Sequence, residues 1–317
     1  MAKGQVIALS GGVGGAKLAL GLSRLGLDDD LLIVTNVGDD FEHLGLNICP
    51  DLDSVIYALA GLNDQEKGWG RADEGWRFME AIGELGAENW FNLGDRDLAM
   101  HVVRTQALAR GESLTQVTAA ITRQLGITAN VVPMTDDPVR TMVQTTDGPL
   151  AFQHYFVRDQ CAPVVTGFEF NGIRQAKPQA DFMAALRNPD LRAVIITPSN
   201  PFVSVDPILH LLGVRDALEA TTAPIIAVSP IVGGLAIKGP AAKMMTELGM
   251  PSTALTVAEH YEGLIDGFVL DESDAVLADD IGSLDMRALL AQTVMVSLED
   301  RESLADYVIA AVDELAP

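Results

Sequence analysis

The chain has 317 residues, and its 44 Asp and Glu outnumber its 21 Lys and Arg, giving a formal net charge of −23. This acidic excess argues against nucleic acid and membrane surfaces as partners, because both are bound through clustered Lys and Arg. Hydrophobic residues make up 48% of the sequence, which suits a globular core and excludes a disordered chain. The longest apolar run, residues 223–237, is interrupted by proline and glycine and is too short to cross a bilayer.

Cysteine content and the start of the sequence both favour a cytoplasmic protein. Cys49 and Cys161 are the two cysteines, too few for a disulfide framework or a metal knuckle. The apolar start at residues 5–9 runs into a glycine cluster where the apolar part of a secretion signal would continue. We therefore expect a buried first strand there rather than a signal peptide.

The first third of the chain predicts a strand, a glycine loop and a helix. The strand is expected at residues 5–9 and the helix at 16–25. A second strand is expected at 31–35, followed by a polar, acidic loop over 36–53. A second helix is expected to begin near Asp53.

The middle of the chain predicts an insert and an appendage to this core. Residues 73–125 show a helical pattern, with helices expected at 75–85, 97–109 and, capped by Ser113, up to 125. Short strands follow at 129–132, 141–145, 150–157 and 164–170. Strands this close together favour antiparallel pairing. We therefore expect a helical insert at about 73–125 and a short-strand appendage at about 129–170.

The last part of the chain alternates strands with helices. Strands are expected at 193–197, 225–229, 267–270 and 294–298, and helices at 207–220, 240–248 and 302–315. Continuous apolar strands such as AVIIT are typical of a parallel sheet that is covered on both faces. The fold class predicted is α/β, with a Rossmann-like, doubly wound, mostly parallel sheet in a single domain over residues 1–317.

Three loops rich in glycine or proline each follow a predicted strand, at residues 10–17, 197–201 and 229–243. In open α/β sheets ligands bind outside the carboxyl ends of the strands. Glycine also lets backbone N–H groups approach an anion at a helix N-terminus. All three loops are therefore candidate phosphate sites, although glycine clusters also serve tight turns.

The first loop matches neither common nucleotide fingerprint. Lys17 stands where G-x-G-x-x-G requires glycine, and no Lys-Ser or Lys-Thr pair completes a P-loop, which argues against an ordinary nucleotide hydrolase. Lys17, Lys238 and Lys243 lie in or beside the loops. Local cations of this kind would help an acidic protein to bind an anion, whereas solvated surface lysines are the alternative.

Two acidic segments indicate a magnesium site. Asp39 and Asp40 follow the second strand, and Asp51 and Asp53 open the second helix. Mg²⁺ takes one or two carboxylates together with water and substrate phosphates, and Asp39 and Asp53 are the candidate ligands. The alternative is that these aspartates form turns and cap the helix.

The segment LGDRD opens a predicted helix and places His101 one turn after Asp97. Arg96 could grip a phosphate or carboxylate, and His101 could act as an acid or base; a helix cap with a salt bridge is the alternative. The five histidines show no zinc-ligand spacing, and no G-x-S-x-G elbow occurs. The residues themselves thus indicate an α/β enzyme that holds phosphorylated ligands with Mg²⁺.

The sequence also resembles the 2-phospho-L-lactate transferase family of deazaflavin coenzyme F-420 biosynthesis. The matching stretches, from Ser10 to about residue 274, are SGGVGGAK, NVGDD, ICPDLDSVIYALAG, WFNLGDRDLAMHVVRT, ANVVPMTDDPV, FQHYFV, TPSNPFVSVDPIL and SPIVGGLAIKGPA. The resemblance implies transfer of a phosphoryl-acid group from a GDP-activated donor to the ribityl hydroxyl of 7,8-didemethyl-8-hydroxy-5-deazariboflavin (Fo). GMP is released, and the product is coenzyme F-420-0 or its dehydro form.

The resemblance also implies roles for particular residues. Asp39 and Asp53 fall on acidic positions near Mg²⁺ and the Fo hydroxyl; Asp53 would contact Fo, both would share the metal, and either is a candidate to take the proton. The Fo side is expected to include Asp53, Asn92, Asp95, Arg96 and His101, although some relatives carry Lys where this chain has Asn92. The nucleotide and phosphate side is expected to comprise Gly11, Gly12, Gly14, Gly15, Lys17, Ser199, Asn200, Pro201, Gly233, Gly234, Lys238 and Gly239.

The partners expected from the resemblance are Fo, a GDP-linked phospho-acid and a second copy of the chain in a homodimer. The acid could be phospholactate, phosphoenolpyruvate or phosphoglycerate, which differ by small groups near one carboxylate. The residue patterns are also compatible with two other functions. One is a nucleotide-dependent phosphoryl transferase with another acceptor, and the other is a GDP-binding sensor without catalysis.

Overall fold

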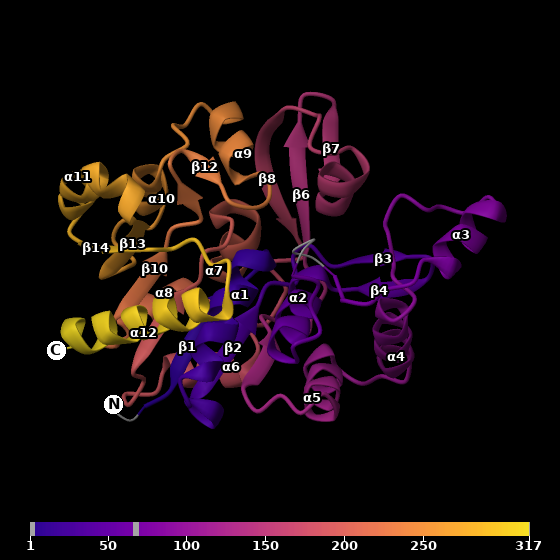
Figure 1. Cartoon of the computed structure of the whole chain (residues 1–317), viewed down its shortest axis with the longest axis horizontal. Helices are drawn as coiled ribbons and strands as arrows, with labels where there is room; N and C mark the ends of the chain where they lie inside the picture. The colour runs from indigo at the N-terminus through magenta and orange to yellow at the C-terminus, as the bar shows by residue number, and fades with distance from the viewer. Residues whose placement is uncertain (1–3, 66–69, 317) are drawn as a thin grey trace.

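A seven-stranded sheet forms the centre of the molecule in the computed structural model, which describes residues 4–65 and 70–316 (Figure 1). Its strand order is β14-β13-β10-β9-β1-β2-β5, and every neighbouring pair is parallel. The strands are β1 (Val6–Ser10), β2 (Leu31–Thr35), β5 (Asn130–Pro133), β9 (Ala193–Ile196), β10 (Ile225–Val228), β13 (Gly267–Asp271) and β14 (Arg287–Ala291). The predicted Rossmann-like α/β fold is confirmed.

Side chains along each strand point alternately to the two faces of the sheet, and this divides the hydrophobic core into two layers. Val6 and Ala8 of β1 face one hydrophobic cluster, whereas Ile7 and Leu9 face the other. The first layer is covered by α1 (Gly12–Arg24), α2 (Pro50–Leu59) and α12 (Leu298–Leu315). The second is covered by α6 (Ala180–Leu186), α7 (Asp206–Leu209), α8 (Val214–Ala220), α9 (Ala241–Glu247) and α10 (Ala254–His260). Both faces of the sheet are therefore buried, which explains why its strands are apolar at consecutive positions.

The order of the strands fixes where a ligand can bind. From β1 the chain builds outward through β2 and β5, and it later returns beside β1 as β9 and builds outward in the opposite direction. The loops that leave the carboxyl ends of β1 and β9 therefore diverge and leave a crevice between them. The glycine cluster after β1 and the TPSNP loop after β9 flank this crevice. The helix predicted at 16–25 begins earlier, so that from Gly12 onward this cluster, still called the glycine loop below, forms the first turn of α1.

Further elements extend from the central sheet, several of them beyond its carboxyl edge (Figure 1). A hairpin of β3 (Phe41–His43) and β4 (Leu46–Ile48) follows β2, and the helices α3 (Arg77–Glu84), α4 (Asp97–Ala109) and α5 (Leu114–Gln124) precede β5. The strands β6 (Arg140–Thr145), β7 (Gly148–Ala151) and β8 (Val165–Asn171) form an antiparallel sheet in the order β7-β6-β8. The remaining elements are the hairpin β11 (Ile231–Val232) and β12 (Leu235–Ala236), α11 (Ala278–Gly282), the 3-10 helices Asp28–Asp30 and Glu272–Leu277, and the π-helical turns His154–Arg158 and Pro201–Val205.

Some predicted elements match closely and have clear local causes. Helix α4 has the predicted bounds, and Ser113 caps α5 through a capping box with Gln116. Helix α2 begins at Pro50 rather than near Asp53, because proline suits the first turn of a helix. The predicted loop over 36–53 also contains the β3–β4 hairpin.

Four predicted elements are wrong. Residues 129–132 do not join the appendage, because β5 pairs with β2 at the edge of the central sheet. The strand predicted at 150–157 ends at Ala151 and gives way to the π-helical turn His154–Arg158. The last strand lies at β14 rather than at 294–298, where the Ser297 cap begins α12. The helix predicted at 207–220 is divided into α7 and α8 by Gly213, which has a φ of +78°.

No helix in the described residues is long and apolar enough to cross a membrane.

Candidate active site

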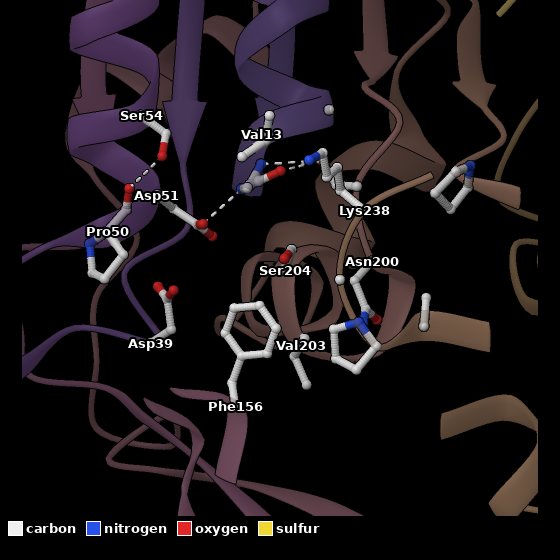
Figure 2. A pocket seen from close by; sticks show the side chains of 18 of the residues that line it. Val13, Asp39, Pro50, Asp51, Ser54, Phe156, Asn200, Val203, Ser204 and Lys238 are labelled. Atoms are coloured by element: carbon white, nitrogen blue, oxygen red, sulfur yellow. Dashed lines mark hydrogen bonds between the residues drawn. The ribbon is translucent and has the colours of Figure 1, made fainter. Parts of the chain in front are cut away.

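A cavity of about 510 Å³ lies at the crevice between β1 and β9. Its walls come from the loops that follow β1, β2, β9, β10 and β14, together with α2, α4 and the turn after β7. Chain segments far apart in the sequence therefore meet at one edge of the sheet, where the sequence predicts ligand binding. Figure 2 shows the glycine loop and Asp51 on one side of this cavity and Asn200, Val203 and Ser204 on the other.

The glycines of the first loop allow close packing beside the cavity. An added Cβ would overlap the carbonyl oxygen of Pro198 at Gly14 and would lie 2.6 Å from Ser10 Oγ at Gly15. The Gly12 N–H donates to Asp51 Oδ1 at 2.6 Å, and its φ of +65° favours glycine. The loop thus brings the start of α1 against the β9 loop, as well as lining the cavity.

Asp39 and Asp51 form a buried carboxylate pair in the wall of the cavity. Asn36 Nδ2 donates to both, at 3.4 Å to Asp39 Oδ1 and 2.9 Å to Asp51 Oδ2. Gln153 Nε2 donates to the second oxygen of Asp39 at 3.1 Å. The hydrogen-bond donors to both carboxylates in the described residues are thus amides, which carry no charge.

The environment of this pair disfavours two negative charges. Burial, followed by the charges of Asp51 and Asp40, raises the pKa of Asp39 well above its ordinary value. Burial raises the pKa of Asp51 to about 6, although Asn36 and the Gly12 N–H oppose the shift. A proton or a bound cation would relieve this repulsion.

Asp53, two residues after Asp51 on α2, has a different environment. Arg104 Nη1 donates to Asp53 Oδ2 at 3.0 Å, and Arg104 Nη2 donates to Asp53 Oδ1. His101 Nδ1 lies 3.7 Å from Asp53 Oδ2, and His101 Nε2 lies 3.2 Å from Asp97 Oδ2. The guanidinium group therefore neutralises Asp53, whereas Asp39 and Asp51 have amide partners.

The Asp97 side of this network is also tightly bonded. The Tyr57 hydroxyl donates to Asp97 Oδ1 at 2.5 Å. Burial works against ionisation of Asp97, but hydrogen bonding and charge from His101, with the Tyr57 bond, hold its pKa below the ordinary value. His101 therefore lies between two carboxylates and belongs to a polar network in the wall of the cavity.

Aromatic side chains line the part of the cavity nearest the appendage. Phe152 and Phe156 stack with ring centroids 5.5 Å apart and an angle of 11° between their planes. Phe156 is 38% exposed, and Figure 2 shows its ring between Asp39 and Val203. Phe91 lines the same cavity. A planar heteroaromatic ligand could stack here.

Positive charge gathers at the glycine-rich side of the cavity. Lys17 and Lys238 both line it, and Figure 2 shows Lys238 beside Val13 at the start of α1. Lys17 Nζ donates to the carbonyl oxygen of Met295 at 2.6 Å. Burial, followed by the charges of Arg301 and Lys238, lowers the pKa of Lys17. The cations are close enough to repel one another, and an anion bound between them would relieve that repulsion.

The structure brings most of the predicted site residues together. Those that line the cavity are Gly11, Gly12, Gly14, Lys17, Asp39, Asp53, Asn92, His101, Ser199, Asn200, Lys238 and Gly239. Those that lie outside its lining are Gly15, Asp95, Arg96, Pro201, Gly233 and Gly234.

Most of the residues outside the lining have structural roles. Asp95 Oδ1 accepts a hydrogen bond from the Phe78 N–H at 3.1 Å, and Arg96 is exposed. The Gly233 N–H donates to Asp274 Oδ2 at 2.9 Å. Lys243, which the sequence also singled out, pairs with Glu247 instead of facing the cavity.

Sequence reasoning missed four contributors to the cavity and its acidic pair: Asn36, Asp51, Gln153 and Phe156. Asp51 lies in the acidic segment that indicates a magnesium site, with a helix cap as its alternative role. It does accept a hydrogen bond from a backbone N–H, but that N–H belongs to Gly12 of another helix. Asn36 directly follows β2, and a polar residue at the carboxyl end of a strand is the signal that could have identified it. Phe156 lies in the matching stretch FQHYFV, but its segment also fits a strand, and no pattern in it singles out this ring.

No group of three His, Cys, Asp or Glu residues with metal-site geometry occurs in the described parts of the chain. A divalent ion would therefore rest on a carboxylate pair, with water and substrate oxygens completing its shell, which is the usual arrangement for Mg²⁺.

Comparison with known proteins gives a consistent result. The family described as "2-phospho-L-lactate transferase CofD" matches residues 6–306. A "phosphoenolpyruvate transferase" of Streptomyces griseus is 36% identical over 317 residues, covering 98% of this chain and 99% of that protein. A "2-phospho-L-lactate transferase" of Methanosarcina acetivorans is 38% identical over 308 residues, covering 97% of this chain and 99% of that protein.

A crystal structure of a UPF0052-family protein from Bacillus halodurans is similar in fold. Its TM-score is 0.65 at 15% identity, and the match covers 98% of this chain and 99% of that one. At this identity the likeness supports the fold alone.

Proposed function

Because the chain belongs to the 2-phospho-L-lactate transferase family, we propose that it transfers a phosphoryl-acid group from a GDP-activated donor to the ribityl hydroxyl of Fo and releases GMP. The product would be coenzyme F-420-0 or its dehydro form. Relatives named for phospholactate and for phosphoenolpyruvate are 38% and 36% identical to this chain. The proposal therefore names the class of donor, in which the acid is phospholactate, phosphoenolpyruvate or phosphoglycerate.

The observation that carries the proposal is the position of the Asp39–Asp51 pair between two unlike walls. One wall is aromatic, with Phe152 and Phe156, and suits a planar ring. The other wall has Lys17 and Lys238 beside the glycine loop and suits a diphosphate. A carboxylate pair between an aromatic wall and a phosphate wall is where an acceptor hydroxyl would meet a phosphorus atom (Figure 2).

We propose that Mg²⁺ is bound by Asp39 and Asp51. The pair fits the ion, because both carboxylates are buried, their hydrogen-bond donors are neutral amides, and their pKa values are raised. Asp53, which the sequence favoured as a ligand with Asp39, has both oxygens bonded to Arg104. Asp53 is therefore better suited to contact the acceptor, and Asp51 takes its place as the second ligand. Bound there, Mg²⁺ would neutralise charge on the transferred phosphoryl oxygens.

The proposed reaction is a displacement at phosphorus. The Fo hydroxyl oxygen forms a bond to the phosphorus that carries the acid, and the bond from that phosphorus to the GMP phosphate oxygen breaks. The electron pair leaves with GMP, and the hydroxyl proton passes to a neighbouring carboxylate, for which Asp39 and Asp53 are the candidates. Lys17 and Lys238 oppose the charge that develops on the departing phosphate. Such a reaction needs positioning and charge neutralisation more than covalent participation by the protein.

Titration of the purified protein with Fo, followed by Fo fluorescence, tests the proposal. We expect saturable binding that tightens when GDP and Mg²⁺ are present. Binding of GDP without binding of Fo at high micromolar concentration would instead favour another acceptor or a GDP sensor. The two remaining functions are then separated by whether a GDP-linked donor is consumed.

A further inference from the structure

Arg104 is a fully buried cation whose role no sequence pattern identified. It belongs to α4, and its exposed fraction is 0%. A buried charge is costly unless a partner of opposite charge and further hydrogen bonds compensate it. Arg104 has these in Asp53, in the carbonyl oxygen of Asn47 at 3.3 Å, and in His101 Nδ1 at 3.4 Å.

The contact between Arg104 and Asp53 fixes the plane of the carboxylate. The two Nη atoms donate to the two carboxylate oxygens, a paired geometry that lysine cannot reproduce with one nitrogen. Asp53 also lines the cavity, whereas Arg104 lies behind it and outside its lining. The orientation that Asp53 presents to a ligand is therefore set by α4, a helix outside the central sheet.

The surroundings of Arg104 are built to hold it in place. The carbonyl oxygen of Asn47, in the middle of β4, accepts a hydrogen bond from one nitrogen of Arg104, and His101 lies one turn earlier on α4. His101 is itself fixed beside Asp97. The guanidinium group is thus held from several elements and has no free rotamer to adopt without leaving a buried charge unpaired.

We infer that Arg104 is a positioning residue for the acceptor, acting through Asp53. By clamping both oxygens of Asp53, it holds that carboxylate in one orientation toward the cavity, so that an acceptor hydroxyl meets it at a fixed place. The inference rests on the proposed function for the identity of the acceptor. It also gives a role to the helix that follows LGDRD, although Asp95 and Arg96 of that segment lie outside the cavity lining.

Two substitutions separate charge from geometry. Arg104→Lys keeps the charge and loses the paired donors, and Arg104→Gln keeps an N–H donor and loses the charge. Arg192→Lys is the matched control, because Arg192 is 7% exposed, donates to both oxygens of Asp313, and lies outside the cavity lining. The dissociation constants and KM values for Fo and for the guanosine ligand are measured, together with Tm.

For Arg104→Lys we expect the Fo dissociation constant and KM to rise about tenfold or more, since hydrogen bonds to a charged group are lost. We expect GDP binding to change less than about twofold, because Asp53 is not on the nucleotide side. Arg192→Lys should lower Tm comparably while leaving both affinities unchanged. In an Asp53→Asn background, Arg104→Lys should weaken Fo binding by less than about twofold further, because its target is already altered.

Three results would overturn the inference: unchanged Fo affinity in Arg104→Lys, equal loss of Fo and GDP binding, or full additivity with Asp53→Asn. If Arg104→Lys does not fold, the same measurements are made on Arg104→Gln, for which we also expect weaker Fo binding and nearly unchanged GDP binding. Failure of wild-type protein to bind Fo would defeat the proposed function instead. Normal Fo binding by the wild type and by both Arg104 variants would defeat this inference alone.

Discussion

Three aspartates of the same short region have different environments because their partners differ. Asp53 is paired with a guanidinium group, whereas Asp39 and Asp51 share the amide of Asn36. Sequence reasoning could identify the acidic region but not this division, because Arg104 is 51 positions from Asp53 and Asn36 is 15 from Asp51. The partner, rather than the residue type, decides which carboxylate is free to accept a cation or a proton.

Asp51→Asn should abolish most of the turnover while leaving Fo binding nearly intact. Loss of one metal carboxylate is expected to lower kcat by about a hundredfold or more and to weaken Mg²⁺ binding measured by calorimetry. Asp53→Asn should instead raise KM for Fo and leave Mg²⁺ affinity nearly unchanged. Asp306→Asn, at an exposed position of α12, is the control. Equal Mg²⁺ affinity in wild type and Asp51→Asn would refute the assignment of the metal.

The raised pKa values of Asp39 and Asp51 predict how the metal-free protein responds to pH. Between about pH 4 and pH 7 the folded state binds more protons at these groups than the unfolded state does, so their contribution to stability falls as pH rises. In EDTA, the Tm of wild type relative to that of Asp39→Asn/Asp51→Asn should therefore fall from pH 5 to pH 7.5. Added Mg²⁺ should raise the wild-type Tm more at pH 7.5 than at pH 5. A difference in Tm that stays constant over this range would contradict the prediction.

Elements at the carboxyl edge of the sheet supply both the aromatic wall and the cationic wall of the cavity. Helix α4 and the cap of α5 were predictable, because their apolar spacing and capping residues are local signals. The turn that carries Phe156 was not, because apolar residues at 150–157 match a strand as well as a helical turn. Tertiary packing decides between the two, and here it places an aromatic ring in the cavity.

Removing the aromatic ring at the π-helical turn should weaken acceptor binding selectively. For Phe156→Ala we expect the KM for Fo to rise about three- to tenfold, the range expected for one lost aromatic stacking contact. GDP affinity should be unchanged. Leu212→Ala, at a side chain that is 77% exposed and outside the cavity lining, is the control. Parallel loss of Fo and GDP affinity would show that the ring supports the fold rather than the acceptor.

The glycine loop is predicted to be intolerant of side chains at its packed positions. Gly14→Ala should destabilise the protein by about 1–3 kcal/mol, because its Cβ would overlap the Pro198 carbonyl oxygen of the β9 loop. It should also weaken GDP binding. Gly282→Ala is the control, since an added Cβ there meets open space on α11, and it should be neutral or slightly stabilising. The free energy of unfolding of both variants is measured in urea. Equal values for Gly14→Ala and wild type would contradict the proposed overlap with Pro198.

For the molecule as a whole, the sequence predicts the type of sheet but not the order of its strands. Apolar strands and the loops after them predict a doubly wound sheet with a site at its carboxyl edge, and the structure has both. The strand order and the place of β5 depend on pairings between distant segments, for which the sequence carries no local signal. The homodimer inferred from the resemblance stays a prediction, which sedimentation of the purified protein can test.

The net charge of −23 makes the local arrangement of cations decisive for binding the anionic donor that we propose. Lys17 and Lys238 line the cavity and the charge of Arg301 acts on Lys17, so a small positive region stands within an acidic molecule. We therefore propose that the donor's diphosphate binds at the glycine loop and the acceptor at the aromatic wall, with the Asp39–Asp51 pair between them.

The most direct test is to count products. Wild-type protein is incubated with Fo, Mg²⁺ and each of the three GDP-linked acids in turn, and mass spectrometry quantifies GMP and the Fo-phospho-acid conjugate. We expect equal amounts of both products with at least one donor, and neither product when Asp51→Asn replaces the wild type. Release of GMP without the Fo conjugate, or no reaction with any donor although Fo and GDP both bind, would contradict this expectation.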